Sequence, residues 1–514
     1  MVQSGTATVS TDNSILLVVL HQGDDTNPSH WESVRKQAQS SGFSVEIVTL
    51  SSATSSVTGL VNAAIKRSVA TFVAVVTNEL TFTKDAFERL RDSLLAEKDL
   101  DIVYGNSVQP GAAKHDRSVL RPALSPERLR CQFYLGNFVL IRRAFLEKLG
   151  GFDDTRPGAQ LYDSVLRGVR AGATATRIEF ALTEVRGNQS TVEGFGTVDW
   201  ALASRSLTAT LEEHLQATGG GKVVSVGENG VHQTVRSVVG NPLVSIVIPT
   251  RGIHANVDGV HRSFLLEALA SITEMSTYTN IEFVIVVDDV AEPGVLTELR
   301  RLTGEKLRLV TWDKPFNFSD KVNFGAVHAS GEFLLILNDD VVVITPDWIE
   351  RLLALAQLPG AGMAGAMLYF EDDTIQHAGH AYYRGEASHV GLDQPRGDPG
   401  PLAGYRVERE IAGVTAACAL MPRAVFYEAG GLSGLLPGNF NDVDLCMKVT
   451  WLGYEIYWTP HAELYHFESK TRDATVMSFE VDVHWGRWAN RMHDAAYWPY
   501  PLTRQPVSWI SGIW

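Results

Sequence analysis

The sequence predicts an α/β protein with two tandem Rossmann-like domains, each built on a mostly parallel sheet. Short apolar runs alternate with helical patterns in two stretches, from residue 14 to 141 and again from residue 244 onward. Alternation of this kind indicates a doubly wound sheet. The two halves also resemble each other in order: IRRAFLEKLGGF at 141–152 aligns with MPRAVFYEAGGL at 421–432, and QLYDSVLRGVRAG at 160–172 aligns with NDVDLCMKVTWLG at 441–453. Two matching patches in the same order indicate an internal duplication.

The first half predicts a sheet of its own. Each apolar run is too short for a helix and is followed by polar residues or by a helical pattern, which is typical of buried strands. Strands are predicted at residues 14–20, 43–50, 70–76, 102–104 and 138–141, and helices at residues 31–40 and 85–97.

A connector follows the first half. After about Asn188 the alternation stops, and a helical pattern at 198–216 ends in three glycines, a common helix stop. Two short strands, at 222–226 and 234–239, are predicted after it. The predicted division is a first domain at 1–190, a connector of one helix and a strand pair at 191–241, a second domain at 242–500, and an aromatic-rich tail at 501–514.

Composition excludes some classes of protein. With 514 residues the chain is too long for one core, and 45% hydrophobic and 20% charged residues are ordinary for a globular protein. The net charge of −15 argues against a nucleic-acid surface, which would need clustered Lys and Arg. No apolar run reaches the length of a membrane span, and the first residues lack the pattern of a signal peptide. We therefore expect a cytoplasmic protein.

The most informative stretch is GEFLLILNDDVVVITPDW at residues 331–348. Its apolar run, 333–337, ends abruptly at Asn338, Asp339 and Asp340. A buried parallel strand that delivers acids to its carboxyl end has this pattern, and open α/β sheets bind their ligands there. An acidic turn between two strands has the same pattern, so this stretch alone leaves both interpretations open.

Five segments in order resemble family 2 glycosyltransferases of the GT-A fold, and more closely the bacterial two-domain O-antigen or rhamnan type. The segments are IPTRG at 248–252, the strand end at Asp288, NDD at 338–340, NDVD at 441–444 and YHFES at 465–469. The resemblance implies two GT-A-like domains and transfer of a sugar, with inversion, from a nucleotide sugar to an acceptor hydroxyl. It also implies a divalent ion, Mn²⁺ or Mg²⁺, which acts as a Lewis acid on the leaving diphosphate.

The resemblance implies three metal ligands. Asp340 occupies the last position of the family's D-x-D element and is the main expected ligand, because hard cations prefer carboxylate oxygens. Asn338 replaces an acid at the first position and is expected to act through its carbonyl oxygen or through water. His466 matches a further ligand of many members, and an imidazole favours Mn²⁺. Read alone, His466 has the pattern of a core histidine.

Asp442 matches the general base of the family, which takes a proton from the acceptor hydroxyl. The residue also stands at the start of a helical pattern, where an anion stabilises the first turn. Both roles are compatible. Asp444, two residues further along, is expected to support the site or to cap the helix.

The expected substrate-binding set also follows from matches to the family. Asp288 is expected near the base or ribose, whereas Lys321 is expected either to neutralise phosphate or to be a solvated surface lysine. Arg487 and Trp488 resemble an element that closes some family 2 sites, although an amphipathic helix has the same pattern. The full set is Pro249, Thr250, Arg251, Asp288, Lys321, Asn323, Asp339, Asn441, Arg487 and Trp488.

The first half is predicted to lack the chemistry. In the alignment of the halves Thr77, Asn78 and Glu79 fall over the NDD, Leu161 falls over Asp442, and Glu184 falls over His466 if one gap is allowed. An aliphatic side chain cannot accept a proton. We therefore expect the first domain to keep the fold and to serve acceptor binding, assembly or stability.

The predicted function is that of an inverting, metal-dependent glycosyltransferase of bacterial surface polysaccharide synthesis. The resemblance implies dTDP-rhamnose or a UDP-sugar as donor, and a saccharide or lipid-linked saccharide as acceptor. The aromatic tail fits contact with the inner face of the membrane or with a partner subunit, and it fits packing on the domain equally well. The alternative is a non-catalytic carbohydrate-binding or scaffolding protein of a glycan-assembly complex.

Overall fold

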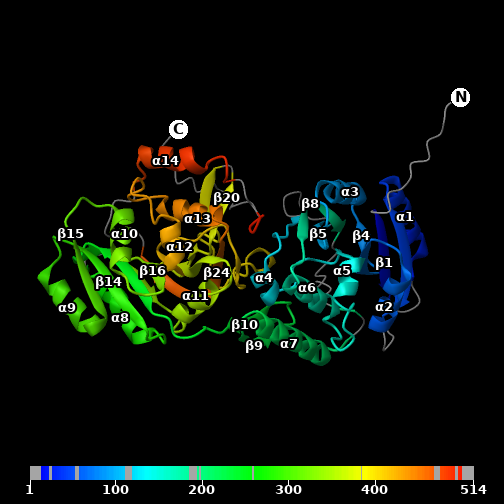
Figure 1. Cartoon of the computed structure of the whole chain (residues 1–514), viewed down its shortest axis with the longest axis horizontal. Coiled ribbons are helices and arrows are strands. Elements are labelled where there is room, and N and C mark those ends of the chain that lie inside the picture. Colours follow the sequence, from blue (N-terminus) through cyan, green and yellow to red (C-terminus); the bar gives the residue numbers. More distant parts are fainter. Residues whose placement is uncertain are drawn as a thin grey trace. The chain divides into compact units, whose positions relative to one another are not determined.

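The computed structural model describes residues 13–21, 26–52, 57–109, 118–184, 194–195, 198–257, 260–383, 385–467, 475–492 and 496–499. The chain divides into two compact units, Met1–Val235 and Arg236–Trp514 (Figure 1). The predicted aromatic tail lies outside the described residues. Among those residues, no helix combines the length and the apolar character that crossing a membrane requires.

The first unit is an α/β sheet with helices on both faces. Its elements are β1 (Ser14–His21), α1 (Pro28–Ser40), β2 (Ser44–Ser51), α2 (Val57–Arg67), β3 (Phe72–Thr77), β4 (Thr81–Phe82), α3 (Ala86–Ala96), β5 (Ile102–Val108), β6 (Ser118–Val119), α4 (Pro126–Cys131), β7 (Val139–Arg142), α5 (Arg143–Lys148), α6 (Gln160–Arg170), β8 (Ala175–Glu184), α7 (Trp200–Ala217), β9 (Gly221–Val226) and β10 (His232–Arg236).

The second unit repeats this arrangement with additions. The elements of its first part are β11 (Val244–Thr250), β12 (Ala255–Val257), β13 (Val260–Arg262), α8 (Phe264–Met275), β14 (Ile281–Asp288), α9 (Pro293–Thr303), a 3₁₀ turn (Gly304–Lys306), β15 (Leu307–Trp312), α10 (Phe318–His328), β16 (Phe333–Leu337), β17 (Val341–Val343) and α11 (Trp348–Ala356). They are followed by β18 (Ala361–Tyr369), β19 (Ile375–His377), β20 (His380–Tyr383), β21 (Glu386–His389), a 3₁₀ turn (Pro401–Ala403), β22 (Arg409–Glu410), β23 (Cys418–Pro422), α12 (Arg423–Glu428), α13 (Asn441–Trp451), β24 (Glu455–His466) and α14 (Ser478–Trp488).

The two sheets have the same strand order. The first reads β2-β1-β3-β7-β5-β8-β4, and the second reads β14-β11-β16-β23-β18-β24-β17 with β15 added at the edge. In both, the strands on one side of the sheet are parallel, whereas β7 and its counterpart β23 run antiparallel to their neighbours. The predicted α/β class with two tandem sheets is confirmed, and each sheet is parallel on one side and mixed on the other.

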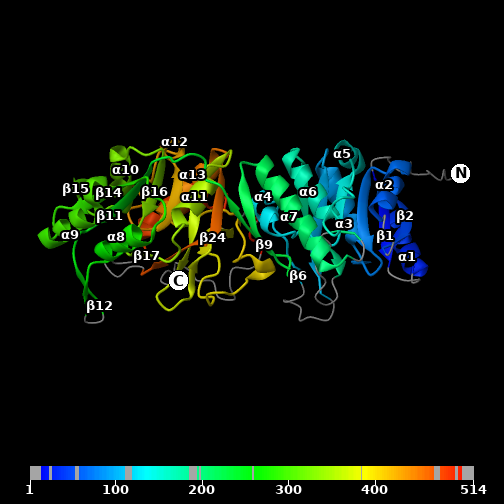
Figure 2. The ribbon, with the colours of Figure 1, turned by 90° about the horizontal axis from the view of Figure 1, so that it is seen from below.

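Helices cover both faces of the second sheet. Side chains of α8, α9 and α11 share one buried apolar cluster with one face of the strands, and side chains of α10, α12 and α13 share another with the opposite face. Figure 2 shows α10 and α8 on opposite sides of this sheet. In the first unit α1 and α3 cover one face, and α2, α5 and α6 cover the other. The corresponding helices therefore lie on corresponding faces.

The strand that leads into the predicted site, β16, is buried as expected. All five residues of β16 are buried, and β16 lies parallel to β11, which in turn lies parallel to β14. The carboxyl ends of parallel neighbours meet at one edge of the sheet. The residues after β11, β14 and β16 are therefore delivered to the same place.

An asparagine clasp is present in both units. In the first, the side chain of Asn62 on α2 accepts a hydrogen bond from the Phe152 backbone N–H at 3.0 Å and donates one to the Phe152 carbonyl at 2.8 Å. In the second, Asn323 on α10 makes the same two bonds with Leu432, at 2.9 and 2.8 Å. Both clasped residues directly follow the Gly-Gly pair of the sequence repeat.

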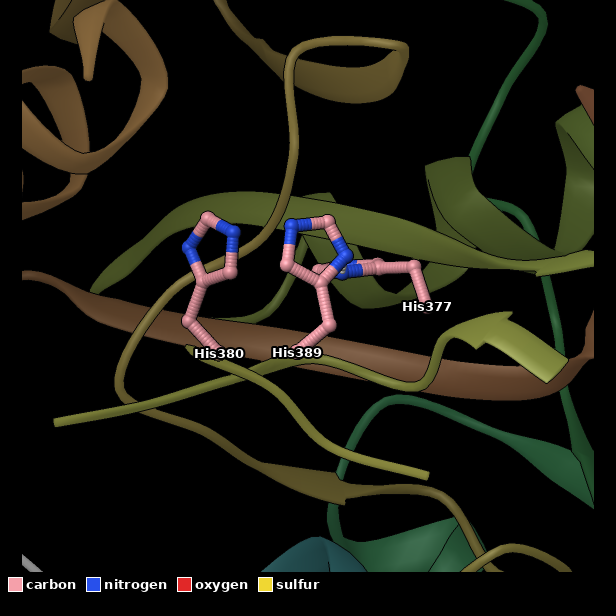
Figure 3. Close-up of side chains that lie close together, drawn as sticks. All are labelled: His377, His380 and His389. Carbon is pink, nitrogen blue, oxygen red and sulfur yellow. Dashed lines mark hydrogen bonds between the residues drawn. The ribbon is translucent and has the colours of Figure 1, made fainter. Parts of the chain in front are cut away.

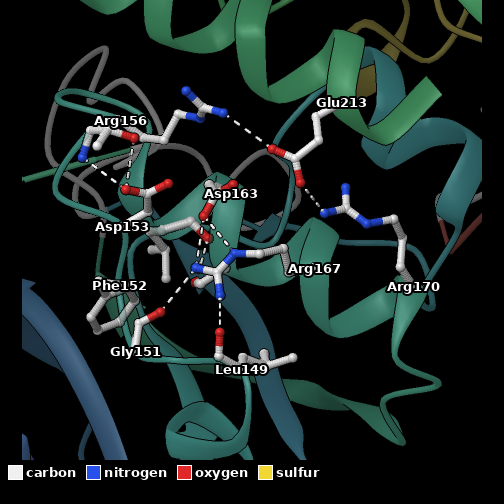
Figure 4. A network of polar contacts seen from close by, with 12 residues as sticks. Leu149, Gly151, Phe152, Asp153, Arg156, Asp163, Arg167, Arg170 and Glu213 are labelled. Carbon is white, nitrogen blue, oxygen red and sulfur yellow. Dashed lines mark hydrogen bonds and ion pairs between the residues drawn. The ribbon is translucent and has the colours of Figure 1, made fainter. Parts of the chain in front are cut away.

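A basic side chain closes the same turn in both units. Arg167 pairs with Asp163 at 2.7 Å and donates to the carbonyls of Leu149 and Gly151 (Figure 4). In the second unit Lys448 pairs with Asp444 at 3.1 Å and donates to the Gly431 carbonyl. The clasp and this ion pair are the parts of the repeat that both units keep, so we assign them to folding and not to the reaction.

The clasp gives a stability prediction. We expect Asn62→Ala to lower the stability of the first unit by about 1–3 kcal/mol, because a backbone N–H and a carbonyl lose their partners. Asn323→Ala is expected to do the same to the second unit. Calorimetry of the full chain should show each variant shifting one transition and leaving the other in place. If both transitions keep their positions in both variants, the clasp does not stabilise the units.

The strand registers test the alignment of the halves. Phe72 pairs with Arg142 on β7, as Phe333 pairs with Pro422 on β23, so Phe72 and Phe333 are counterparts. Five, six and seven residues further along stand Thr77, Asn78 and Glu79 in the first unit and Asn338, Asp339 and Asp340 in the second. Leu161 and Asp442 are both the second residue of an 11-residue helix. These parts of the alignment are confirmed.

The alignment was wrong at Glu184. Glu184 pairs with Val108 on β5. The counterpart of Val108 in the second unit is Tyr369 on β18, and Tyr369 pairs with Tyr465. Glu184 therefore stands over Tyr465 and not over His466. Each of these two strand pairs contains a register irregularity, which a linear alignment with one gap cannot place. The next residue of the first unit lies outside the described residues.

The structure groups the helix and the first strand of the predicted connector with the first unit. The helix α7 packs on α6 and follows β8, as α14 packs on α13 and follows β24. The sequence pattern suggests a separate connector because the strand–helix alternation stops there. The four-part division of the chain stays a prediction.

Candidate active site

A cavity of about 660 Å³ opens at the carboxyl ends of β11, β14 and β16. It brings together residues that are far apart in the sequence. Eleven of the fourteen predicted site residues line it: Pro249, Thr250, Arg251, Asp288, Lys321, Asn338, Asp339, Asp340, Asn441, Asp442 and His466. Their roles stay predictions, but their convergence on one cavity is a property of the fold.

One wall of the cavity carries the predicted metal ligands. His466, at the end of β24, pairs with Val341, the residue that follows Asp340. This pairing places His466 Nε2 at 3.2 Å from Asp340 Oδ1 and at 3.0 Å from Asn338 Nδ2. His466 Nδ1 lies 2.7 Å from Gln376 Oε1, and Gln376 Nε2 donates to the His466 carbonyl at 3.4 Å. Gln376 thereby fixes the orientation of the imidazole.

This wall has the donor chemistry of a divalent-ion site. Because Gln376 Oε1 can only accept, His466 carries its proton on Nδ1, and its Nε2 accepts from the Asn338 amide N–H at 3.0 Å beside Asp340 Oδ1. The Asn338 amide oxygen is buried and accepts no hydrogen bond among the described residues. Carboxylate, amide oxygen and imidazole are a set that Mn²⁺ accepts. The residues present therefore fit the ion that the resemblance implies.

The next wall holds a buried charge pair. Lys321 on α10 is 1% exposed and lies 2.6 Å from Asp288 Oδ1, at the end of β14, and it also donates to the Thr250 carbonyl at 2.6 Å. Burial lowers the pKa of Lys321, and the carboxylate of Asp288 opposes this effect. The solvated-lysine interpretation of Lys321 was wrong. A helix that packs its first turn against two strand ends buries this side chain.

Asp339 turns away from Asp340 toward β11. Its Oδ2 accepts a hydrogen bond from the Thr250 hydroxyl at 2.6 Å. Burial, together with the neighbouring charge of Asp340, raises the pKa of Asp339. The two adjacent acids therefore face different partners, and Asp340 is the one that faces His466.

The opposite wall carries Asp442 on α13. Its Oδ1 accepts from the Val443 N–H at 2.8 Å and its Oδ2 accepts from the Ala416 N–H at 3.4 Å. The helix begins after Phe440, whose φ of 58° lies in the left-handed region. The counterpart in the first unit, Ala159, has a φ of −131°. Strain at this point is thus confined to the unit that has the carboxylate, as expected where a site imposes the backbone conformation.

The helix α14 holds the loop before Asp442. Glu480 is 1% exposed and accepts from the backbone N–H groups of Gly438 and Asn439 at 2.9 and 2.8 Å. The imidazole of His484 stacks on the Phe440 ring, with centroids 4.5 Å apart. Two residues of α14 thereby fix the strained turn.

Arg487 and Trp488 do not line the cavity. Both donate to Asp444 Oδ1 at 2.9 Å. Burial alone would raise the pKa of Asp444, but the charge of Lys448 and the bonds from Trp488 and Arg487 more than offset it, so the pKa is lowered. The expectation that Arg487 and Trp488 contact substrate is corrected: they neutralise a buried carboxylate outside the cavity lining.

Asn323 does not line the cavity either. Both ends of its side-chain amide are used in the clasp on Leu432. Its counterpart Asn62 makes the same clasp in the first unit, where Thr77 and Asn78 stand at the strand end. The expectation of a nucleotide contact at Asn323 is corrected on this ground.

The sequence reasoning missed several residues of the cavity. Gln376, His380, His389 and Glu480 line it, and none of them was predicted. The histidines give a visible signal, since His377, His380 and His389 stand within thirteen residues of the chain. Glu480 gives none, because only the docking of α14 shows which loop it binds.

A mixed α/β sheet with acids at the ends of its parallel strands defines a class of proteins that bind ligands at that edge of the sheet. Comparison with known families points to one family. Residues 245–430 match the model of glycosyl transferase family 2. This segment of the chain therefore resembles family 2 glycosyltransferases, and the resemblance noted in the sequence is confirmed.

Two curated proteins are similar over most of this chain. An uncharacterized protein of Sinorhizobium fredii, y4gI, is 31% identical over 85% of the chain, and the O-antigen biosynthesis protein RfbC of Myxococcus xanthus is 29% identical over 78% of it. The chain spans 48% and 31% of the length of these relatives.

Two solved structures show distant similarity. One is GalNAc-T7 with UDP, GalNAc and Mn²⁺, with a TM-score of 0.39 and 16% identity over half of each chain. The other is the mannosyltransferase PcManGT of Pyrobaculum calidifontis in complex with GDP-Man and Mn²⁺, with a TM-score of 0.32 and 17% identity over 46% of this chain and 60% of that one.

Proposed function

We propose that the second unit is an inverting, metal-dependent glycosyltransferase that moves a sugar from a nucleotide sugar to a saccharide acceptor. One observation carries the proposal: Asp340, His466 and Asp442 converge on one cavity together with the Lys321–Asp288 pair. The family 2 match of residues 245–430 supports it. The name of the RfbC relative supports a role in the synthesis of a bacterial surface polysaccharide.

The proposed roles follow from the position of each side chain. Asp442 accepts the proton of the attacking acceptor hydroxyl, and its two amide contacts keep it oriented. Asp340, His466 and Asn338 hold a divalent ion. When bound, this ion supplies the positive charge that stabilises the leaving nucleoside diphosphate. Arg251, Lys321 and Asp288 bind the nucleotide side of the donor, and Thr250 keeps Asp339 turned toward β11.

The proposed donor is dTDP-rhamnose or a UDP-sugar, and the proposed acceptor is a saccharide, free or linked to a lipid. A lipid-linked acceptor would place the protein at the inner face of the membrane. The first unit is proposed to be non-catalytic, because the strand end that carries Asp340 in the second unit carries Glu79 in the first, and Leu161 stands in the place of Asp442.

A thermal-shift screen tests this function. We expect one nucleotide sugar to raise the unfolding temperature of the full chain with Mn²⁺ and not without it, because a ligand at a hundred times its dissociation constant adds about 2.7 kcal/mol of stability. The same donor should release nucleoside diphosphate in the presence of metal. If no donor stabilises or is turned over while saccharides still bind, the scaffolding alternative replaces the enzyme.

A further inference from the structure

Three histidines come together beside the cavity, apart from the predicted metal ligands. His377 ends β19, and His380 and His389 are a paired position of the β20–β21 hairpin. One ring nitrogen of each lies within 4.8 Å of those of the other two. Figure 3 shows the nitrogen-bearing edges of His380 and His389 turned toward each other. We call these three residues the histidine cluster.

The spacing of the three rings suits one ion. The ring centroids of His377 and His389 lie 4.7 Å apart, those of His377 and His380 5.0 Å, and those of His380 and His389 5.1 Å. An ion about 2.0–2.1 Å from one nitrogen of each ring, with tetrahedral angles, requires centroids about 5 Å apart. The 3.1 Å between His377 Nδ1 and His389 Nδ1 is close to the separation of about 3.3 Å between two ligands of such an ion. The rings therefore have the near-equal spacing of a three-ligand site.

Burial keeps two of the rings neutral. His377 and His380 are buried, and burial lowers the pKa of each below the ordinary value of a histidine. A neutral imidazole keeps one lone pair, and a metal ion binds through that lone pair. Nδ1 of His380 is buried and makes no hydrogen bond with any described residue, whereas buried polar atoms in proteins nearly always have a partner. The His380 ring therefore has bonding capacity that no described protein group uses.

One hydrogen bond competes with an ion. The Thr415 N–H donates to His377 Nε2 at 3.1 Å, and this contact favours a proton on Nδ1, the nitrogen that faces His389. When Nδ1 binds an ion, the ring proton moves to Nε2 and the Thr415 contact is lost. One such bond corresponds to about ten-fold in affinity, which is a small part of the affinity of protein ligands for Zn²⁺. The proposed site at His466 requires a similar exchange, because the Asn338 amide N–H must leave its Nε2.

Donor chemistry separates the histidine cluster from the proposed Mn²⁺ site. The cluster offers three imidazoles, whereas the other wall offers the Asp340 carboxylate, an amide oxygen and one imidazole. Nitrogen ligands bind Zn²⁺ more tightly than Mn²⁺, and carboxylates suit Mn²⁺. Gln376 contacts both: its Oε1 lies 2.7 Å from His466 Nδ1, and its carbonyl oxygen lies 3.1 Å from His389 Nδ1. The two sites are therefore neighbours with different metal preferences.

The cluster faces the same cavity as the proposed base. His380 and His389 line the cavity together with Asp442. Consecutive backbone amides support both groups, because the N–H groups of residues 415 and 416 donate to His377 and to Asp442, respectively. Catalytic zinc sites have three protein ligands and keep the fourth position for water or substrate. An ion held by the cluster can therefore present its fourth position to the cavity.

We propose that His377, His380 and His389 form a second metal site, which binds an ion of the Zn²⁺ class through three imidazoles. Its fourth position takes water or an oxygen of a molecule bound in the cavity beside Asp442. Occupation of that position by an acceptor oxygen rests on the proposed function, whereas binding of the ion does not.

Cobalt and zinc test the site in the full chain, prepared without a histidine tag and freed of metal. We expect Co²⁺ to give a tetrahedral absorption spectrum that Zn²⁺ removes. His380→Gln should weaken Zn²⁺ binding in calorimetric titration by about 100-fold or more, since loss of a partner of a ligand already costs 10- to 100-fold. The half-buried His389 provides a second variant, His389→Gln, should His380→Gln not fold. His328→Gln on α10, outside the cavity lining, is the matched control. A wild-type chain without a tetrahedral spectrum, or a Zn²⁺ affinity that survives both cluster variants, overturns the site.

Manganese separates this inference from the proposed function. Electron paramagnetic resonance should show Mn²⁺ binding that is lost in Asp340→Asn and retained in His380→Gln, and the tetrahedral Co²⁺ spectrum should respond in the opposite way. A Co²⁺ spectrum that is lost in Asp340→Asn as well would mean one shared site and would overturn the second one. If no nucleotide sugar is turned over while the Co²⁺ and Zn²⁺ results are as expected, the proposed function fails and the second metal site stands.

Discussion

Asp442→Asn is expected to lower the rate of sugar transfer by about 10²- to 10⁴-fold, which is the usual contribution of a general base. An amide has nearly the same shape as a carboxylate and keeps an oxygen for the Val443 N–H, the shorter of the two contacts, so only the 3.4 Å contact with the Ala416 N–H is lost and the loop should stay in place. The proton of the acceptor hydroxyl then has no receiving group. Initial rates with the donor found by thermal shift, at saturating donor and acceptor, measure the effect.

The control for this variant is Asp482→Asn, the same chemical change at an exposed position of α14. It should leave the rate and the donor-induced thermal shift as they are. Appreciable transfer by Asp442→Asn would contradict the assignment of the base and would reopen the question of a second active site. The first unit is a poor candidate for one, since the position equivalent to Asp442 is the buried Leu161.

Asp340→Asn is expected to abolish most of the metal dependence of donor binding and to lower turnover by about 10²-fold or more. A metal ion contributes several kcal/mol to a transition state of this kind, and each 1.36 kcal/mol corresponds to about a factor of ten. The substitution removes the carboxylate that faces His466 Nε2 at 3.2 Å and leaves an uncharged amide. A Mn²⁺ titration of activity should show a much higher concentration for half-maximal rate.

The internal duplication supplies a matched control for Asp340. Glu79 occupies the equivalent position of the first unit, and Glu79→Gln should leave the Mn²⁺ titration unchanged. Should Glu79→Gln weaken the metal response as much as Asp340→Asn, both units would contribute to the metal-dependent reaction and the non-catalytic role of the first unit would be wrong.

The strand ends were predictable from the sequence because the signal is local. The apolar run of β16 is short and stops at Asn338, and the same holds for β14 at Asp288. Parallel neighbours must then bring these ends together, so the amino-acid pattern suffices to place Asp288, Asp339 and Asp340 at one edge of the sheet. The alignment of the halves worked for Leu161 and Asp442 for a similar reason, since both open a helix of equal length.

The errors concern residues whose environment depends on packing between distant elements. Asn323 shows no sign in its neighbours that it clasps Leu432, which is 109 positions away. Arg487 and Trp488 were expected at the substrate because the two residue types resemble an element that closes some family 2 sites. The orientation of α14 instead turns both side chains toward Asp444. Glu184 was misplaced by one position because a linear alignment does not register the irregular pairing of β8.

The dependence of the base on α14 also has a consequence for the order in which the active site is built. The strands of the second sheet and α13 all precede α14 in the chain, so the ribosome releases them first, and domains fold largely in the order of synthesis. Until α14 arrives, Asp444 lacks two of its donors and the turn at Phe440 lacks the His484 ring and the Glu480 carboxylate. We therefore expect the turn before Asp442 to reach its final geometry only after α14 has been synthesised and has docked.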